Sequence, residues 1–394
     1  MHLAERMEHL GTETAFEVLG RARELERQGR DVIHLEIGEP DFDTPGNIVE
    51  AGVAALRGGA THYTPAAGVD ALREAIAADQ SRRKGIQCSA ANVVVAPGGK
   101  PIMFFAMLAL LEHGDEVVYP NPGFPIYESM VDFLGAQRVP IGFIEEDRVF
   151  RWDVDAALER IGPQTKLVIL NSPSNPVGCT IAETDLKRLA EAVCRHDAWL
   201  LSDEIYSRIL YDCDFVSPAI FPGMAERTCV LDGFSKTYAM TGWRLGYGVM
   251  PQALAAQVAR LVINCNSCTA TFTQMAGVEA LTGPQDAVDQ MLAEFRRRRD
   301  LVVPALNAIR GVHCPMPQGA FYAFPDIRGT GMASREAADA LLYDANVAVL
   351  SGTAFGANGE GYLRLSYANS YENLERALER MKSVLERHAG VAAT

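Results

Sequence analysis

The stretch at residues 233–246 places Lys236 among small residues, with Arg244 eight positions further along. A lysine amine can form a Schiff base with an aldehyde cofactor, and an arginine guanidinium can hold the phosphate group of such a cofactor. On their own, a lysine and an arginine at this spacing are more often part of a solvated surface. The pair therefore predicts a cofactor site only if the rest of the chain supplies further partners.

The elements around Lys236 follow an alternating pattern. Short apolar runs predict strands at residues 92–96, 116–119, 166–170, 199–202, 229–231 and 245–249. Amphipathic stretches predict helices among them, at residues 101–111 and 182–196. This alternation predicts an α/β fold, in which a mostly parallel sheet is covered by helices on both faces and ligands bind at the carboxyl ends of the strands.

Residues that could bind a ligand or react follow the ends of four predicted strands: Gly98 with Gly99, Asn175, Asp203 and Lys236. The two glycines precede a helix, and bare amides at a helix N-terminus suit an anion, although an ordinary turn has the same sequence. Asp203 closes an apolar run, where a buried carboxylate is costly unless it is paired; capping of a following helix is the alternative. If these strand ends meet in one crevice, they assemble one site.

The pattern changes after residue 285. A helical stretch continues to about residue 309, short strands are predicted at residues 321–324, 348–350 and 362–367, and a helix closes the chain at residues 371–388. These elements predict a smaller α+β domain at residues 286–394. In its last strand, period-2 alternation puts Arg364 on one face with Tyr362 and Ser366, and an arginine inside a strand usually faces solvent.

Composition limits the function classes. The chain has 394 residues, 48% of them hydrophobic, and a net charge of −14, which argues against nucleic acid or an anionic membrane surface as a partner. No apolar run approaches the ~20 residues of a membrane span, and the polar N-terminus is unlike a signal peptide. The pair Cys265 and Cys268 has no second pair for a metal site, so we expect reduced thiols, no metal and a cytoplasmic protein. The basic run at residues 296–299 is expected to be a solvated face.

Taken together, these motifs resemble one known family. The lysine run at residues 233–246, the Asn-Pro-x-Gly sequence at Asn175 and the Arg-Leu-Ser-Tyr sequence at Arg364 resemble those of the class I/II pyridoxal-phosphate aminotransferases, in the same order along residues 36–367. The resemblance implies the fold of type I enzymes of this cofactor, with a large domain built on a seven-stranded type of sheet. By analogy, residues 1–45 join the small domain and residues 46–285 form the large, cofactor-binding domain.

The resemblance also implies roles for residues at the ring of pyridoxal 5′-phosphate. Lys236 would carry the cofactor, and Asp203 would pair with its protonated pyridine nitrogen. Tyr206, three residues after Asp203 and on the same face of an expected first helical turn, would reach the same ring. Asn175 would donate to the phenolic oxygen, although a turn is its simpler interpretation. Phe124, in the sequence Asn-Pro-Gly-Phe-Pro, would stack on the ring; a core aromatic is the alternative.

The cofactor phosphate would be held by residues from two strand ends: Gly98, Gly99, Lys100, Ser235 and Arg244. Some relatives have a phosphate-binding serine three residues before the lysine, where this chain has Gly233. Phosphate binding is therefore expected to depend more on the other groups.

For the substrate, the resemblance implies that Arg364 grips the α-carboxylate with both guanidinium nitrogens and that Gly38 lies in a loop over the substrate. Tyr63 would cross to the cofactor phosphate of a partner subunit, which implies a homodimer with shared sites. Lys100 occupies a position that contributes to binding a second carboxylate in some aspartate-using relatives. Glu13 lies nearby and would repel such a carboxylate, so the donor and the acceptor stay open.

The function predicted from these motifs is that of an aminotransferase, which moves an amino group between an L-amino acid and a 2-oxo acid in two half-reactions, with aspartate/alanine-type or broad specificity. One alternative is a lyase that uses the same cofactor for β-elimination, which the cofactor motifs do not exclude. Another is a non-catalytic effector-binding module of a transcription regulator. The chain has no basic DNA-binding segment before the α/β region and keeps every catalytic residue, which argues against the module.

Overall fold

The centre of the molecule is a seven-stranded sheet. We describe it from a computed structural model of the chain, which describes residues 3–389. In spatial order the strands are β2 (Val93–Ala96), β10 (Gly246–Val249), β9 (Thr228–Gly233), β8 (Trp199–Asp203), β7 (Thr165–Asn171), β3 (Glu116–Pro120) and β4 (Gln137–Ile141). Only β10 is antiparallel to its neighbours, β2 and β9. The predicted α/β fold with a mostly parallel sheet is therefore confirmed.

Helices cover both faces of this sheet, which explains why its strands are nearly all apolar. In β2, Val94 and Ala96 pack into one core, while Val93 and Val95 pack into another on the opposite face. The first face is covered by α4 (Lys100–Leu110), α5 (Pro125–Phe133) and α8 (Gln252–Asn266). The second is covered by α3 (Asp70–Lys84), α9 (Thr271–Thr282), α6 (Val154–Arg160) and α7 (Glu183–Arg195), and α2 (Gly46–Arg57) packs on α9.

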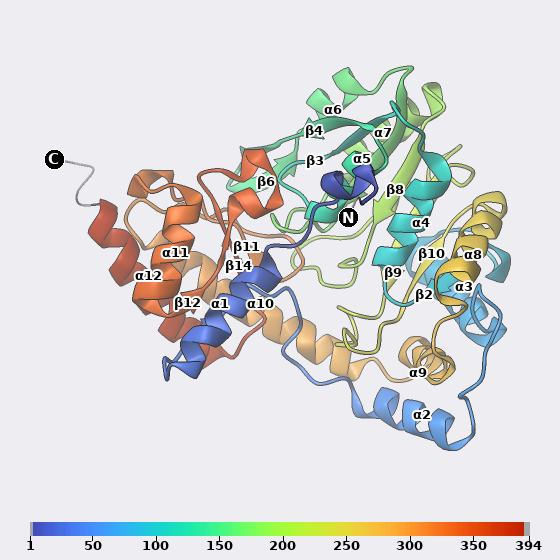
Figure 1. Cartoon of the computed structure of the whole chain (residues 1–394), viewed down its shortest axis with the longest axis horizontal. Coiled ribbons are helices and arrows are strands. Elements are labelled where there is room, and N and C mark those ends of the chain that lie inside the picture. The colour runs from blue at the N-terminus through green and yellow to red at the C-terminus, as the bar shows by residue number, and fades with distance from the viewer. Residues whose placement is uncertain (1–2, 390–394) are drawn as a thin grey trace.

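A second core lies beside the large sheet, at the left of Figure 1. It contains the long helix α10 (Asp286–Asn307), α11 (Ser334–Ala345) and α12 (Tyr371–Ala389). Its strands are β11 (Tyr322–Ala323), β14 (Leu363–Ser366) and β13 (Leu350–Ser351), joined in that order as an antiparallel sheet. A separate pair joins β1 (Ile33–His34) in parallel to β12 (Val347–Ala348).

The N-terminal segment contacts both cores. Helix α1 (Ala15–Arg27) packs Ala22 and Leu25 against Leu342 and Ala348 of the second core. In contrast, the short helix η1 (Glu5–His9) lies on α5, and the Gly11 amide donates to the Ser129 hydroxyl at 2.9 Å. Figure 1 shows this segment in blue, reaching from α5 to the second core. The assignment of residues 1–45 to the small domain stays a prediction. The same holds for the predicted domains at residues 46–285 and 286–394.

Several elements have no counterpart among the sequence predictions. The hairpin of β5 (Phe143–Glu146) and β6 (Val149–Trp152) turns at Asp147 and Arg148, both in the left-handed region of φ. Short 3-10 helices lie at Ala90–Asn92, Pro218–Ile220, Arg328–Thr330, Gly352–Phe355 and Ala357–Gly359. Within residues 3–389, no helix is long and apolar enough to cross a membrane.

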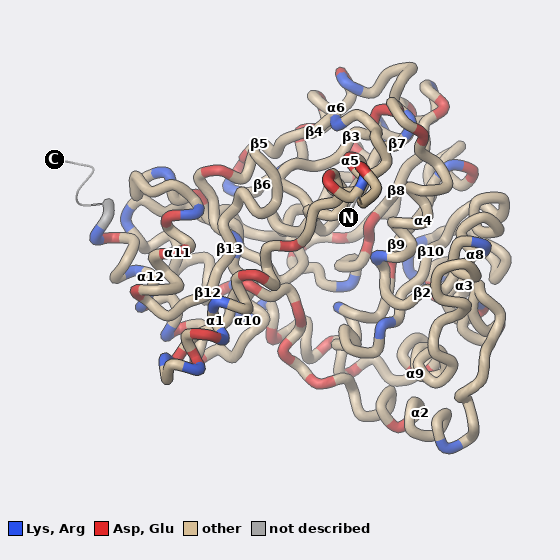
Figure 2. The backbone as a smooth tube through the Cα atoms, viewed as in Figure 1, with Lys and Arg blue, Asp and Glu red and all other residues tan. Residues whose placement is uncertain are grey.

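The basic run on α10 is not the solvated face that its sequence suggested. Arg298 and Arg299 are 4% and 5% exposed, and each forms ion pairs with carboxylates. Arg298 reaches Asp41 at 2.6 Å and Arg299 reaches Asp212 at 2.9 Å. Figure 2 shows acidic and basic residues interspersed over both cores. Four consecutive residues go once around a helix, so part of this run faces the protein and part faces solvent. The two arginines on the inner side are buried where carboxylates from other segments neutralise them.

Candidate active site

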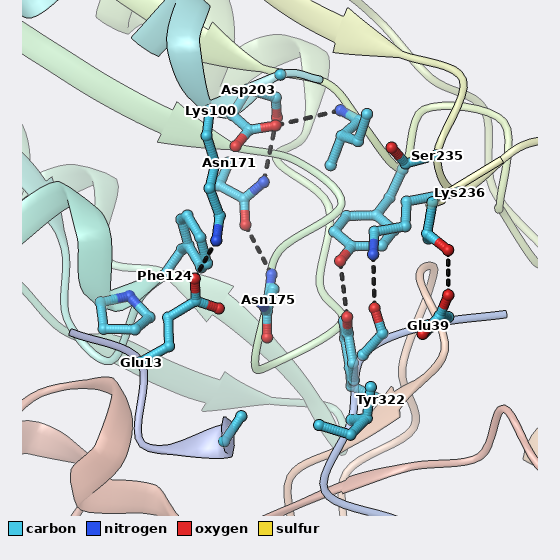
Figure 3. A pocket seen from close by; sticks show the side chains of 18 of the residues that line it. Glu13, Glu39, Lys100, Phe124, Asn171, Asn175, Asp203, Ser235, Lys236 and Tyr322 are labelled. Atoms are coloured by element: carbon cyan, nitrogen blue, oxygen red, sulfur yellow. Dashed lines mark hydrogen bonds and ion pairs between the residues drawn. The ribbon is translucent and has the colours of Figure 1, made fainter. Parts of the chain in front are cut away.

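A cavity of about 560 Å³ lies where the carboxyl ends of β7, β8 and β9 meet the second core. It collects all the predicted site residues except two, Gly98 and Tyr63. Gly98 lies directly beneath Arg244 at the edge of the cavity. Tyr63 is 87% exposed and away from the cavity. The residues that line it come from opposite ends of the chain, as Figure 3 shows for Glu13 and Tyr322.

Lys236 enters the cavity from a turn that follows β9. Its Nζ donates to the carbonyl oxygen of Gly38 at 2.5 Å, which ties the lysine to the N-terminal loop. Burial lowers the pKa of Lys236 to about 8, against the opposing attraction of Glu39. An amine with this pKa has an appreciable neutral fraction near pH 7, and the neutral amine is the form that attacks a carbonyl or accepts a proton.

Asp203 ends β8 with its carboxylate buried at the floor of the cavity. The Tyr127 hydroxyl donates to Asp203 Oδ2 at 2.6 Å, and the Ile205 amide donates to Oδ1 at 3.3 Å. Burial raises the pKa of Asp203 to about 6 despite these two donors. Among residues 3–389 this carboxylate forms no ion pair, and a positively charged group in the cavity would stabilise its ionised form.

No helix follows Asp203, so the helical turn expected to carry Tyr206 is wrong, and so is the alternative of a helix cap. The chain continues in tight turns, in which the Ile209 amide donates to the Tyr206 carbonyl at 2.8 Å. Beyond them, the Tyr211 amide donates to Gln318 and the Ala320 amide donates to Ile209. These bonds to the second core take up backbone groups that a helix would have needed. Tyr206 still lines the cavity.

Two asparagines connect β7 to this floor. Asn171 donates to the Asp203 carbonyl at 3.2 Å and accepts from the Asn175 amide at 2.7 Å (Figure 3). Asn175 Oδ1 is buried and has no hydrogen-bond partner among the described residues. An orphaned polar atom of this kind indicates that the cavity receives a polar ligand. Asn171 was not among the predicted site residues, because its contribution is to hold Asn175 and Asp203 together.

Gly98 and Arg244 form a close contact at one end of the cavity. Gly98 has φ +94°, and a Cβ atom there would lie 2.1 Å from Arg244 Nη2, so only glycine fits. The guanidinium donates to the Thr241 carbonyl at 2.8 Å and to the Pro97 carbonyl at 3.2 Å. Helix α4 begins at Lys100, immediately after Gly99. A guanidinium beside the N-terminus of a helix provides a site for an anion.

Phe124 forms part of the cavity wall beside Lys100. The Lys100 amine lies 5.4 Å from the centre of the Phe124 ring, and the Tyr127 ring meets Phe124 edge to face at 5.5 Å. Lys100 also forms a close ion pair with Glu13, which comes from the segment before α1 (Figure 3). The side chain of Lys100 is half exposed, so this pair lies at the mouth of the cavity.

Arg364 reaches the cavity from β14 and is buried rather than solvent-facing. Its Nη2 donates to the Glu36 carbonyl, while its Nε has no hydrogen-bond partner among residues 3–389. The guanidinium lies 4.6 Å from the centre of the Tyr322 ring and 5.2 Å from that of Phe355. Burial lowers the pKa of Arg364 from its usual value. A buried guanidinium with unused donors is suited to binding a carboxylate.

Tyr322 was missed by the sequence analysis, although it links three parts of the site. Its hydroxyl lies 2.7 Å from the hydroxyl of Tyr206, and its ring lies under Arg364. A Cβ atom on Gly38 would come within 2.3 Å of the Tyr322 hydroxyl, so the loop requires glycine there. In sequence, Tyr322 belongs to the apolar run at residues 321–324, which is typical of a core strand. Only the register of β11 against β14 reveals that this ring faces the cavity.

Comparisons with known proteins agree with this geometry. The model of the family Aminotransferase class I and II matches residues 30–381. The chain is 40% identical to an aspartate aminotransferase of Pyrococcus horikoshii, over 98% of this chain and 97% of that protein. It is 38% identical to an aromatic-amino-acid aminotransferase of Thermococcus litoralis, over 98% and 99%. The solved structure of an aspartate aminotransferase from Thermus thermophilus with maleate superposes with a TM-score of 0.92 at 38% identity, covering 98% of this chain and 100% of that one.

Proposed function

This chain belongs to the class I and II aminotransferases and is therefore a pyridoxal-phosphate-dependent transaminase; from that premise we propose how its own residues divide the reaction and which donors it accepts. The observation that carries the proposal is the cavity itself, where the buried Asp203 carboxylate forms no ion pair with a described residue, and Asn175 Oδ1 and Arg364 Nε have no hydrogen-bond partner among those residues. No finding favours the alternative of a lyase.

The residues present fit the cofactor in kind. Asp203 forms no ion pair within the described part of the chain, and a protonated ring nitrogen would provide its cation. The side-chain oxygen of Asn175 has no hydrogen-bond partner among the described residues. The side-chain nitrogen is next to that oxygen and would donate to the phenolic oxygen of the cofactor. Arg244 and the start of α4 suit a phosphate. Together with Lys236, these groups would hold pyridoxal phosphate through its charged and polar atoms.

When bound, pyridoxal phosphate supplies an aldehyde for the amino group and a ring that accepts electrons from the bond broken at the substrate Cα. Lys236 carries out the proton transfers. Its amine, with a pKa of about 8, takes the proton from the substrate Cα and returns a proton at the end of each half-reaction. Asp203 holds negative charge at the floor of the cavity throughout, and Tyr127 keeps its carboxylate in place.

Arg364 fixes the substrate by its α-carboxylate. The unused donor at Nε and the nitrogens beside Tyr322 offer a two-pronged hydrogen bond to a carboxylate. Because the guanidinium is buried, each charge-assisted bond is stronger than it would be in water. Tyr322 and Gly38 both lie beside the guanidinium, and the Gly38 carbonyl accepts from Lys236, so Arg364 and Lys236 face the same part of the cavity.

Glu13 and Lys100 set the preference for the distal part of the substrate. Relatives are named for aspartate and for aromatic amino acids, so the family relationship alone leaves the donor open. In this chain Glu13 engages the Lys100 amine that a second carboxylate would need. We therefore propose broad specificity in which neutral donors such as alanine compete well, because aspartate must first break this ion pair.

The change Glu13→Gln is expected to favour aspartate. It frees Lys100 and removes a like charge, which should raise kcat/KM for aspartate relative to alanine by about tenfold, equivalent to about 1.4 kcal/mol. Steady-state kinetics with both donors measures the ratio. Glu39→Gln is the matched control, because Glu39 also lines the cavity but bonds to Thr241 rather than to Lys100. An unchanged ratio in Glu13→Gln would remove Glu13 from the specificity determinants.

The donors themselves can be identified without an acceptor. The cofactor-loaded protein is mixed with one amino acid at a time, and the visible absorbance of the bound cofactor is followed. Donors that convert it to the pyridoxamine form identify the accepted side chains and complete one half-reaction. Release of ammonia with no such conversion would instead support the lyase.

We further propose that the chain works as a homodimer in which Tyr63 serves the partner's site. Tyr63 is 87% exposed in the single chain and lies away from its own cavity, which supports a role outside this subunit. A cytoplasmic location is also proposed, because the eight cysteines are free thiols, as expected in a reducing compartment. The domain boundaries near residues 45 and 285 are part of the same proposal.

Mixing two defective variants tests the shared site. Tyr63→Phe removes one hydrogen bond to a charged group and should lower kcat/KM about tenfold, whereas Lys236→Ala should be inactive. When subunits exchange, a mixed dimer contains one subunit of each variant. The site with Lys236 of the Tyr63→Phe subunit receives Tyr63 from the Lys236→Ala subunit and is native, and the other site lacks both residues. The mixture should then regain about a quarter of the native activity, as random pairing into two-fold dimers requires. Activity no higher than that of Tyr63→Phe diluted by half would show that Tyr63 acts in its own subunit.

A further inference from the structure

Behind the cavity floor lies a buried cluster of charges that the reaction described above does not use. Lys84, the last residue of α3, places its amine 2.7 Å from Glu204 Oε2 and 2.7 Å from Asp232 Oδ2. The three side chains are 2%, 1% and 5% exposed. A helix on one face of the sheet is thereby joined to the ends of β8 and β9.

Nearly every polar atom around this cluster has a partner. Glu204 Oε1 accepts from Ser202 at 2.9 Å and from Ser217 at 2.6 Å. Asp232 Oδ1 accepts from the Gly233 amide at 2.7 Å. Two further neighbours close the cluster: Gln80, which donates to Tyr247 at 2.8 Å, and the Phe215 ring, 5.3 Å from the Lys84 amine. Gln80 Oε1 is buried without a hydrogen-bond partner among the described residues, but all four carboxylate oxygens and the amine of the cluster are engaged with one another or with neighbouring groups, so we infer an internal role.

The two carboxylates lie close in sequence to Asp203 and Lys236, the residues proposed above to act in the reaction. Glu204 directly follows Asp203, and Asp232 precedes Lys236 by four residues. The Glu204 amide donates to the Leu231 carbonyl at 2.8 Å, and Asp203 pairs with Leu231 across the two strands. A movement of either carboxylate would therefore shift the backbone that carries Asp203 or the turn that carries Lys236.

The charges of the cluster also act on Asp203. Two carboxylates and one ammonium leave one net negative charge behind the cavity floor. Burial is the main cause of the raised pKa of Asp203, and repulsion from Asp232 and Glu204 adds to it. Burial alone would lower the pKa of Lys84, but attraction to Asp232 and Glu204 raises it, so the amine stays charged. Without that ammonium, two buried negative charges would stand uncompensated beside a third carboxylate.

We propose that Lys84 is a positioning residue for transamination, which bridges Glu204 and Asp232 to hold the ends of β8 and β9 in register and to shield Asp203 from their negative charge. The inference rests on the roles proposed above for Asp203 and Lys236. Lys84 touches neither substrate nor cofactor. Its effect reaches the reaction only through the place and the charge state of Asp203 and through the start of the lysine turn.

Lys84→Met tests this in two ways, because methionine keeps the length of the side chain and removes its charge. In the cofactor-free protein, carboxyl-carbon NMR of labelled aspartate should give Asp203 a pKa above its native value of about 6, with Asp203→Asn to identify the signal. In the loaded enzyme, kcat should fall by about 10- to 100-fold, because small displacements of reacting groups have effects of this size. KM for the amino acid should stay within about threefold, since Arg364 is on another core.

A second variant separates charge balance from packing. Lys84→Met with Asp232→Asn restores one net negative charge, and the new asparagine side chain can still accept from the Gly233 amide. The pKa of Asp203 should return to about 6, and most of the lost kcat should recover. Arg82→Met is the matched control, since Arg82 lies on the same helix with an exposed side chain, and its ion-pair partner Asp79 keeps a second arginine, Arg83. It should change neither quantity.

Two results would overturn the proposal. One is a folded Lys84→Met protein whose kcat and Asp203 pKa both match the native chain. The other is a folded double variant as defective as Lys84→Met, which would mean that only packing was lost. If Lys84→Met does not fold, the double variant decides alone: kcat within about tenfold of native supports the charge bridge, and a loss beyond about 100-fold contradicts it. The NMR titration needs no transamination, so it stands even if the roles in catalysis are revised.

Discussion

Replacement of Lys236 by alanine is expected to lower kcat for transamination by about 10⁴-fold or more, because the chain then loses both its attachment point and its general acid–base group. Among residues 3–389, no other amine is placed to take over. Lys100 lies at the mouth of the cavity and is engaged by Glu13, and Lys84 is buried behind the floor. Single-turnover measurements of 2-oxo acid formation from one amino donor give the rate directly.

Two controls distinguish lost chemistry from a damaged fold. Lys236→Arg keeps the positive charge but cannot deprotonate in the working range, so it should be as inactive as the alanine variant. Added methylamine should partly restore the alanine variant, since the removed side chain leaves room for a small amine that can move the proton from the substrate Cα. An alanine variant within tenfold of native, or one that added amines do not improve while its thermal unfolding is unchanged, would contradict the role of Lys236 as the base.

The fold was readable from the sequence where burial is uniform. The strands of the large sheet are apolar on both faces, so each stands out as a short hydrophobic run between polar stretches. The end of a strand is marked by a change from apolar to polar residues, as at Asn171 and at Ser202 with Asp203. Because parallel strands present their carboxyl ends together, locating those ends was enough to bring Asn175, Asp203 and Lys236 to one cavity.

The sequence was less informative where long-range contacts decide the conformation. The turns after Asp203 replace an expected helix because Tyr211 and Ala320 exchange backbone bonds with segments more than a hundred residues apart in sequence. The hairpin has positive φ at Asp147 and Arg148, and it lacks the glycine that usually marks such a turn in a sequence. In both places local propensity favours another conformation, and tertiary contacts override it.

Side chains that position others were the hardest to recognise. Tyr127 and Tyr322 look like core aromatics, and by burial they are; only their hydroxyls show that they also hold Asp203 and Tyr206. The buried arginines of α10 illustrate the same limit, because their carboxylate partners lie on distant segments. A pattern in one sequence predicts which groups carry charge, but the pairing of those charges depends on the fold.

Asp203→Asn is expected to lower kcat by about 10³-fold, the size of effect that follows loss of one well-placed electrostatic partner in a dry site. Asparagine has nearly the same shape, and its one acceptor oxygen can still accept from the Tyr127 hydroxyl, so the fold should be unchanged; only the longer bond from the Ile205 amide to the other oxygen is lost. What it lacks is the negative charge that favours a protonated ring nitrogen, and that charge matters most when electrons move into the ring. KM for the amino acid should change little, because Arg364 binds its carboxylate elsewhere in the cavity.

Tyr127→Phe is the graded companion to this change, because it removes one hydrogen bond and leaves the charge. The Tyr127 hydroxyl stabilises the ionised carboxylate, so its loss should raise the pKa of Asp203 above its value of about 6 and lower kcat about tenfold or less. Asp203→Glu should lie between the two, since it keeps the charge but displaces it. If Asp203→Asn stayed within fivefold of native while Tyr127→Phe was equally mild, the charge at the cavity floor would not be what drives the reaction. The loss of rate in Asp203→Asn should instead exceed that of Tyr127→Phe by roughly a hundredfold, because a missing charge cannot be replaced by a neutral hydrogen bond in a buried site.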